Sequence, residues 1–108
     1  MTEYKIDHYA IRTWSSRSLS QSSKGMAISA LYLFDKEDRH RGTISFFPDV
    51  LPQLLDPALV TSHPLARNRA DRIELRFYQV QFQPTLDHLR SGEETHIYYQ
   101  DPQNAGLR

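Results

Sequence analysis

Two short apolar runs constrain the fold of this chain most strongly. They are MAISALYLF at 26–34 and TISFF at 43–47, joined by the charged loop DKEDRHRG at 35–42. Short runs rich in β-branched and aromatic residues are typical of strands, and a polar connection between two of them predicts an antiparallel hairpin. With a period of two, both faces of the first strand carry large apolar side chains. We therefore expect the hairpin to lie centrally in a sheet or against another chain, with its loop in water.

Three further segments have strand patterns. Residues 4–14 alternate and are rich in aromatic and β-branched residues, which predicts a first strand. In 71–78, Ile73, Leu75 and Phe77 face inward and charged residues face outward, which predicts a strand with one wet face. THIYYQ at 95–100 predicts a last strand. Before it, Pro84 suits the first position of a helix and Gly92 suits the position just past its end.

The order of these elements predicts an α+β, β-rich fold. It consists of a mainly antiparallel sheet or small barrel of about five strands, with one short helix near residues 84–91. The length of 108 residues favours a single domain spanning 1–108. Six serines and one glycine within 15–25 predict a flexible Ser-rich loop, and DPQNAGLR at 101–108 predicts a turn followed by a frayed C-terminal tail.

Composition narrows the partners and the location. Thirteen Lys and Arg balance thirteen Asp and Glu, so the chain as a whole has no field that would attract nucleic acid, and nucleic acid is a disfavoured partner. The sequence has no cysteine, which fits a reducing cytoplasm. It has neither an apolar signal segment nor an apolar run long enough to cross a membrane. We expect a soluble cytoplasmic protein that does not bind membranes.

The sequence contains no assembled catalytic, cofactor or metal motif. The five histidines, at 8, 40, 63, 88 and 96, are not spaced to place two ligands on one element. The serines are not part of a nucleophile motif, and the four glycines form no phosphate loop. We therefore predict no catalytic residue, no metal and no cofactor, and the balance is against an enzyme.

Paired rings are the most suggestive functional feature. The pairs Phe46–Phe47 and Tyr98–Tyr99 place a ring on each face of their strands, so a second face needs a cover. A homodimer or a protein partner would supply it, and a closed barrel in which the rings are core is the equal alternative. Tryptophan, tyrosine and arginine are the usual interface anchors. The predicted binding residues are Arg12, Trp14, Phe47, Arg76 and Tyr99.

The sequence thus favours a small protein-interaction module that associates with itself through sheet faces or edges. A small-ligand-binding barrel, or an enzyme whose active site has no sequence motif, is the alternative. Single-stranded nucleic-acid binding, with rings as stacking platforms and arginines on phosphates, is the less favoured reading.

Overall fold

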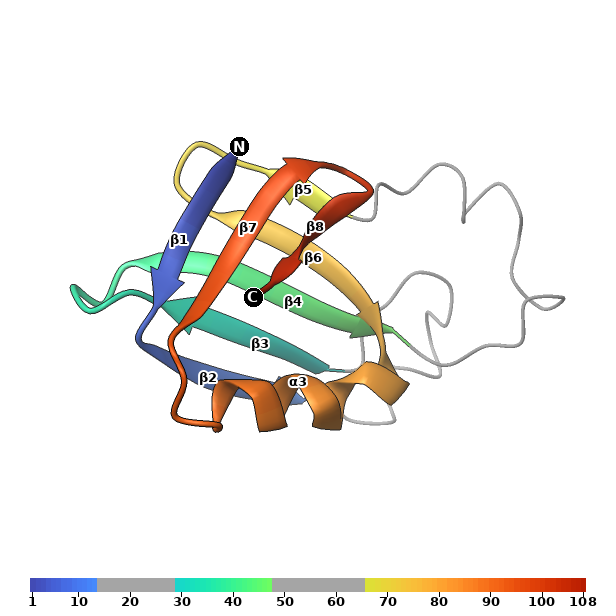
Figure 1. Cartoon of the computed structure of the whole chain (residues 1–108). Helices are drawn as coiled ribbons and strands as arrows, with labels where there is room; N and C mark the ends of the chain where they lie inside the picture. The colour runs from blue at the N-terminus through green and yellow to red at the C-terminus, as the bar shows by residue number, and fades with distance from the viewer. Residues whose placement is uncertain (14–28, 48–65) are drawn as a thin grey trace, which may run out of the picture.

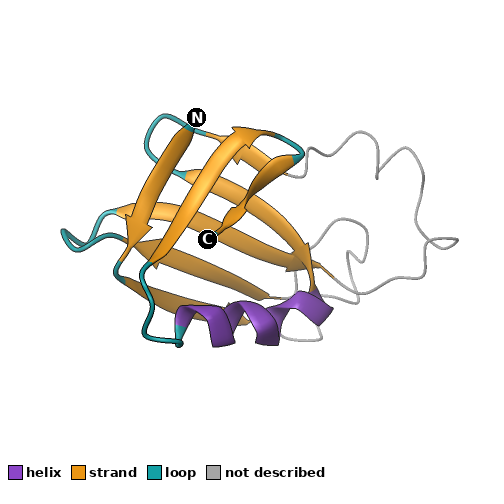
Figure 2. Cartoon of the chain, viewed as in Figure 1, coloured by secondary structure: helices purple, strands orange, loops and turns teal. Residues whose placement is uncertain are grey.

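The computed structural model describes residues 1–13, 29–47 and 66–108 (Figures 1 and 2). The predicted loop at 15–25 and Trp14 lie outside the described residues. The described elements are β1 (Thr2–Ile6), β2 (His8–Thr13), β3 (Ser29–Phe34), β4 (His40–Phe47), β5 (Ala66–Asn68), β6 (Ile73–Tyr78), the 3₁₀ helix η2 (Gln79–Gln81), α3 (Phe82–Leu89), β7 (Thr95–Asp101) and β8 (Asn104–Leu107).

The strands form two sheets. Sheet A has the order β1-β7-β8, and sheet B has the order β2-β3-β4-β6-β5. All strand pairs are antiparallel except β4 with β6. In Figure 1 sheet A lies in front of sheet B, and α3 runs along one side of the space between them. The prediction of an α+β, β-rich fold is confirmed. Of its two alternatives, the mainly antiparallel open sheet is confirmed, and the prediction of a closed barrel is wrong. The described strands also exceed the predicted five.

The predicted hairpin is confirmed, because β3 and β4 pair from Ser29↔Phe46 to Phe34↔His40. Its loop is shorter than predicted, since β4 begins at His40. The loop is also not wholly in water: Asp35 and Gly42 are buried. The Asp35 carboxylate points into the turn, where it accepts hydrogen bonds from the backbone N–H groups of Glu37 and Arg39 at 3.0 Å each, and this orientation buries it.

The predicted single strand at 4–14 is wrong. The chain changes sheets at Asp7, so that β1 pairs with β7 and β2 pairs with β3. The Asp7 backbone N–H donates to the Phe34 carbonyl at 2.8 Å, which fixes the corner. Periodicity alone cannot reveal such a corner because the alternation of side chains is similar on both sides of it.

Two other features of sheet B were not predicted. β5 has only three residues, too few to show a period. β4 and β6 pair in parallel, from Gly42↔Ile73 to Phe47↔Tyr78. A parallel pair requires a long crossover, and the chain between Phe47 and Ile73 supplies it.

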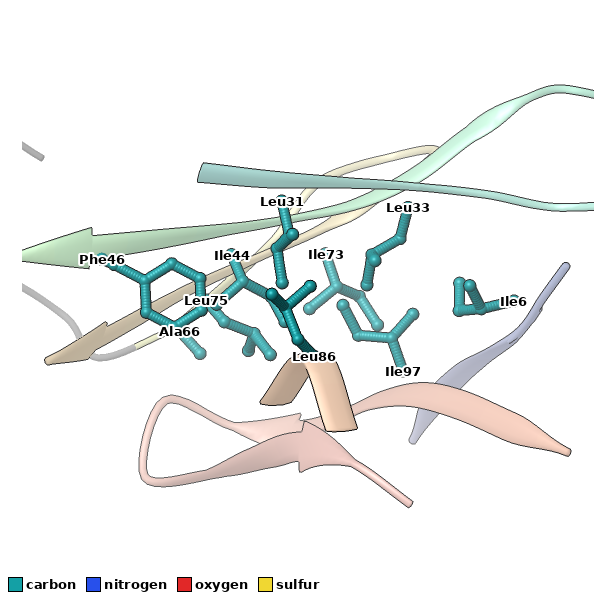
Figure 3. Packing of buried hydrophobic residues seen from close by; sticks show 10 residues of the cluster. All are labelled: Ile6, Leu31, Leu33, Ile44, Phe46, Ala66, Ile73, Leu75, Leu86 and Ile97. Atoms are coloured by element: carbon teal, nitrogen blue, oxygen red, sulfur yellow. The ribbon is translucent and has the colours of Figure 1, made fainter. Parts of the chain in front are cut away.

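The core lies between the two sheets (Figure 3). Strand alternation places one face of sheet B inward, and the predicted inward residues Ile73 and Leu75 are buried there. Ile6 and Ile97 approach from sheet A, and Leu86 approaches from α3. The other buried members of this cluster are Leu31, Leu33, Ile44, Phe46 and Ala66.

The predicted helix near 84–91 is confirmed with a shift, since α3 spans Phe82–Leu89 and follows η2. Pro84 lies in the first turn, where its missing N–H has no intrahelical partner to lose. The helix places Phe82, Leu86 and Leu89 on the core side. Gly92 has φ +83°, a left-handed conformation that glycine adopts without a steric cost.

The prediction of a frayed tail at 101–108 is wrong for its second half. Residues 104–107 form β8, which pairs with β7. Arg108 and His96 also exchange two backbone hydrogen bonds, of 2.7 and 2.9 Å. The predicted turn is present, because the Asp101 carboxylate accepts a hydrogen bond from the Gln103 N–H at 2.9 Å. It joins β7 to β8 and does not lead into a frayed tail.

Candidate functional site: the outer face of sheet B

The outer faces of the two sheets differ in chemistry. On sheet A, β1 directs Glu3 and Lys5 outward, and β7 directs His96 and Tyr98 outward beside them. His96 lies between two carboxylates, with Nδ1 2.9 Å from Glu3 and Nε2 2.7 Å from Glu94. Lys5 forms a 2.9 Å ion pair with Glu94. The charges on this face are therefore paired with one another.

Arg108 completes the network on sheet A. It pairs with Glu3, and its guanidinium lies 4.4 Å from the centre of the Tyr98 ring. The hydrogen bond from Arg108 lowers the pKa of Glu3, and the hydrogen bond from His96 lowers the pKa of Glu94. Charged groups that already pair within their own chain add little binding free energy when a partner docks on them, because docking removes their hydrating water.

The outer face of sheet B carries rings instead. The residues that alternate with the buried ones on β3, β4 and β6 point away from the core. Strand register arranges them in rows across the sheet. These rows are His8–Phe34–His40, then Ala10–Tyr32–Thr43–Glu74–Arg67, then Arg12–Ala30–Ser45–Arg76, and last Phe47–Tyr78. We call this set the ring face.

The ring face has a cluster of rings at each end. At one end the Phe34 ring stacks on His8 with centroids 5.2 Å apart and planes 10° apart, and it lies 5.7 Å from His40. At the other end Phe47 and Tyr78 are neighbours in register, and Tyr78 is 46% exposed. No described helix or strand lies over this face, since α3 packs on the core side.

The structure brings together three of the five predicted binding residues. Arg12, Phe47 and Arg76 all lie on the ring face, and the Arg76 guanidinium lies 5.3 Å from the centre of the Phe47 ring. Tyr99 does not join them: it is opposite Thr2 in sheet A and packs against the core. The fifth predicted residue, Trp14, lies outside the described residues.

Sequence reasoning missed Tyr78 as a ring-face residue. The available signal was the strand period, because Tyr78 has the parity of Arg76 and not of the inward residue Leu75. The missing information was the parallel β4–β6 register, which places Tyr78 beside Phe47. That pairing depends on two segments about thirty residues apart, and no local pattern encodes it.

A second polar cluster lies at the end of the sheets, between β1 and the β3–β4 turn. It lines an open cleft of about 330 Å³. Arg41 lies at its centre, with its guanidinium 4.7 Å from the centre of the Tyr4 ring and its Nε donating to Asp35 at 2.9 Å. Arg39 Nε donates to the same carboxylate at 3.0 Å. Burial opposes ionisation of Asp35, but the backbone N–H of Arg39 and the Arg41 side chain outweigh it and lower its pKa to about 2.

The four histidines in the described ranges differ in how many of their ring nitrogens are occupied. A general base must accept a proton on an available ring nitrogen. Both nitrogens of His8 contact carboxylates, as do both nitrogens of His96. His40 Nε2 lies 2.8 Å from the Gly42 carbonyl oxygen. His88 Nε2 is buried without a partner, so a proton on it would have no acceptor. Among the described residues no group of three or more His, Asp or Glu is arranged to hold a metal ion.

Within the described ranges, no helix has both the length and the apolar character needed to cross a bilayer. Comparison with protein-family models, curated proteins and solved structures found no match to this chain.

Proposed function

We propose that this protein is an interaction module that associates with itself through the ring face of sheet B. The observation that carries the proposal is the contrast between the two outer faces. Sheet A presents ions that are already paired, whereas sheet B presents one exposed ring, Tyr78, beside the partly buried Phe47, which has the Arg76 guanidinium next to it. Aromatic and arginine side chains provide most of the binding energy in typical protein interfaces.

The size of the face limits the strength of the association. Five strands about 4.8 Å apart and about six residues long cover on the order of 400 Å² in plan. Specific, stable interfaces bury about 800 Å² on each partner. The association is therefore weak and concentration-dependent. A second copy fits because a two-fold axis through this face would lay the ring clusters of the two copies against each other.

The absence of cysteine supports a reducing location, so we place this association in the cytoplasm.

Sedimentation velocity between 10 µM and 1 mM tests the proposal, with a matched pair of tyrosine variants. Tyr78→Ala removes a ring-face side chain, and Tyr98→Ala removes a ring from the outer face of sheet A. We expect the wild type to show a rising weight-average mass, Tyr78→Ala to weaken the self-association at least fivefold, and Tyr98→Ala to leave it unchanged. A wild type that is monomeric at 1 mM, or equal weakening by both variants, overturns the proposal.

A further inference from the structure

His8 links two elements that the backbone does not join. It is the first residue of β2, directly after the corner at Asp7. Its Nδ1 donates to Asp7 Oδ2 at 3.0 Å, and its Nε2 donates to Asp38 Oδ1 at 2.7 Å. Asp38 is at the tip of the β3–β4 turn, thirty residues along the chain. In the described part of the chain, this bond is the one polar contact that joins residues 36–39 to another strand.

The pattern of bonds specifies the charge of His8. Carboxylates only accept hydrogen bonds, so both ring nitrogens of His8 must donate. A neutral imidazole has a single N–H, whereas the imidazolium has two. The arrangement is therefore that of the protonated ring.

Other groups around His8 support the same charge. Phe34 lies flat against the ring and is uncharged, and His40 is on the far side of Phe34. Glu93, from the segment between α3 and β7, lines the same hollow as His8 and adds negative charge. The side-chain bonds to Asp7 and then to Asp38 raise the pKa of His8 above its ordinary value.

We propose that His8 is a proton-controlled latch that holds the tip of the β3–β4 turn against β2. When the ring loses a proton it can donate to only one carboxylate. Asp7 is its chain neighbour and stays close, whereas the Asp38 carboxylate has this bond alone among the described residues, and its side chain is 82% exposed. The bond to Asp38 is therefore the one that breaks, and the turn tip is freed together with Lys36 and Glu37, which line the cleft.

The latch has a defined pH range. A raised pKa in the folded state means that protonation stabilises the latched form, fully below the ordinary value of about 6.5 and progressively less as the pH rises through the folded-state value. Inside the turn, Asp35 stays ionised throughout this range, because its pKa is about 2. The turn therefore keeps its own hydrogen bonds while its tip detaches from β2.

Two NMR measurements test the latch. The first is the titration of the His8 ring carbon-bound protons, whose midpoint we expect above 6.5 in the wild type and lower in Asp38→Asn. Asparagine suits this position because Asp38 has φ +63°, which asparagine tolerates. The second is the amide ¹⁵N order parameter of residues 36–38 at pH 5.5. We expect it to fall from about 0.85 in the wild type toward 0.6 in both Asp38→Asn and His8→Gln.

Glu94→Gln is the matched control, because it removes a carboxylate from His96 in the same way and should change neither measurement. A His8 midpoint at or below 6.5 in the wild type overturns the latch. So does a turn that stays equally rigid in either His8→Gln or Asp38→Asn. His8 is also a member of the ring face, but the latch is read from its titration and from the order parameters of the turn, whereas the association is read from sedimentation, so either proposal can fail while the other stands.

Discussion

Gly42 is the residue that sets how closely the two sheets approach. It lies in β4 between Leu33 and Ile73 on the inner face of sheet B, and a Cβ built on it would lie 2.5 Å from Cδ1 of Ile97 in sheet A. Ile97 is itself fully buried, so it has little room to retreat. The small residue is required by the close packing of the opposite sheet and not by a special backbone angle.

Gly42→Ala is expected to destabilise the protein by about 1–3 kcal/mol, the usual cost of overpacking a core. Gly106→Ala is the matched control, because its added Cβ would meet the Tyr98 ring at 3.6 Å, an ordinary contact distance. Gly106 is buried as well, so the two sites differ in the room for an added methyl group, and we expect the control to cost clearly less than Gly42→Ala. Urea denaturation followed by circular dichroism measures both, and equal effects of the two variants would contradict the packing argument.

Asp35 makes the stability of the folded protein depend on pH in the acidic range. Its folded-state pKa of about 2 is below the ordinary value, so its contribution is complete above the ordinary value and is lost as the pH falls from about 4 toward 2. Asp35→Asn should lower the Tm at pH 7 and flatten the decline of Tm between pH 4 and 2. Glu37→Gln alters an exposed partner of Arg39 and serves as the control. If the decline persists unchanged in Asp35→Asn, another carboxylate causes it.

At the scale of elements, the helix α3 is joined to the sheets mainly by side chains. Phe82 meets Phe46 edge to face at 5.0 Å, and Arg90 Nε donates to the Tyr9 hydroxyl at 2.6 Å. Leu86 is 4% exposed and enters the core between the sheets. Eight residues are too few for a helix to be stable alone, so these contacts hold it.

Leu86→Ala is therefore expected to cost about 2–5 kcal/mol, as for other buried leucines. Asp87→Ala, on the exposed side of the same helix, should cost less than about 1 kcal/mol, since it loses only an exposed hydrogen bond to Gln83. Urea midpoints for the two variants provide the measurement. A small loss for Leu86→Ala would mean that α3 contributes little to the fold.

The elements that could be predicted from sequence were those with a local signal. The alternation at Ile73 and Leu75 is a local signal that predicted β6. The proline and glycine around α3 are local signals that predicted the helix. Each element was predicted to within a few residues of its observed position. The corner at Asp7 and the parallel register that joins Phe47 to Tyr78 depend on contacts between distant segments. For the same reason the sequence identified Arg12, Phe47 and Arg76 by residue type, but not the face that they share.

At the scale of the whole molecule, a neutral chain distributes its charge unevenly. The ring face holds three arginines, at 12, 67 and 76, against one glutamate, Glu74. Glu74 is already paired with Arg69 at 2.9 Å. Arg67 and Arg76 leave the described part of this face with an excess of positive charge, so two copies that meet through it bring together surfaces of mostly like charge. The rings favour the contact, and the arginines oppose it at low ionic strength.

Salt consequently distinguishes the possible partners of the ring face. At 0.05 M salt the Debye length is above 10 Å, and at 0.5 M it is only about 4 Å, so added salt screens the repulsion between arginines while leaving ring burial intact. Sedimentation velocity should show self-association that tightens severalfold over this range.

A nucleic acid held on the same face through its phosphates would instead bind more weakly as salt rises, because counterion release is lost. Titration with a fluorescent single-stranded oligonucleotide at 0.05 M salt provides that comparison. Self-association that weakens with salt would contradict the role of the rings, and tight oligonucleotide binding would assign the face to a nucleic acid.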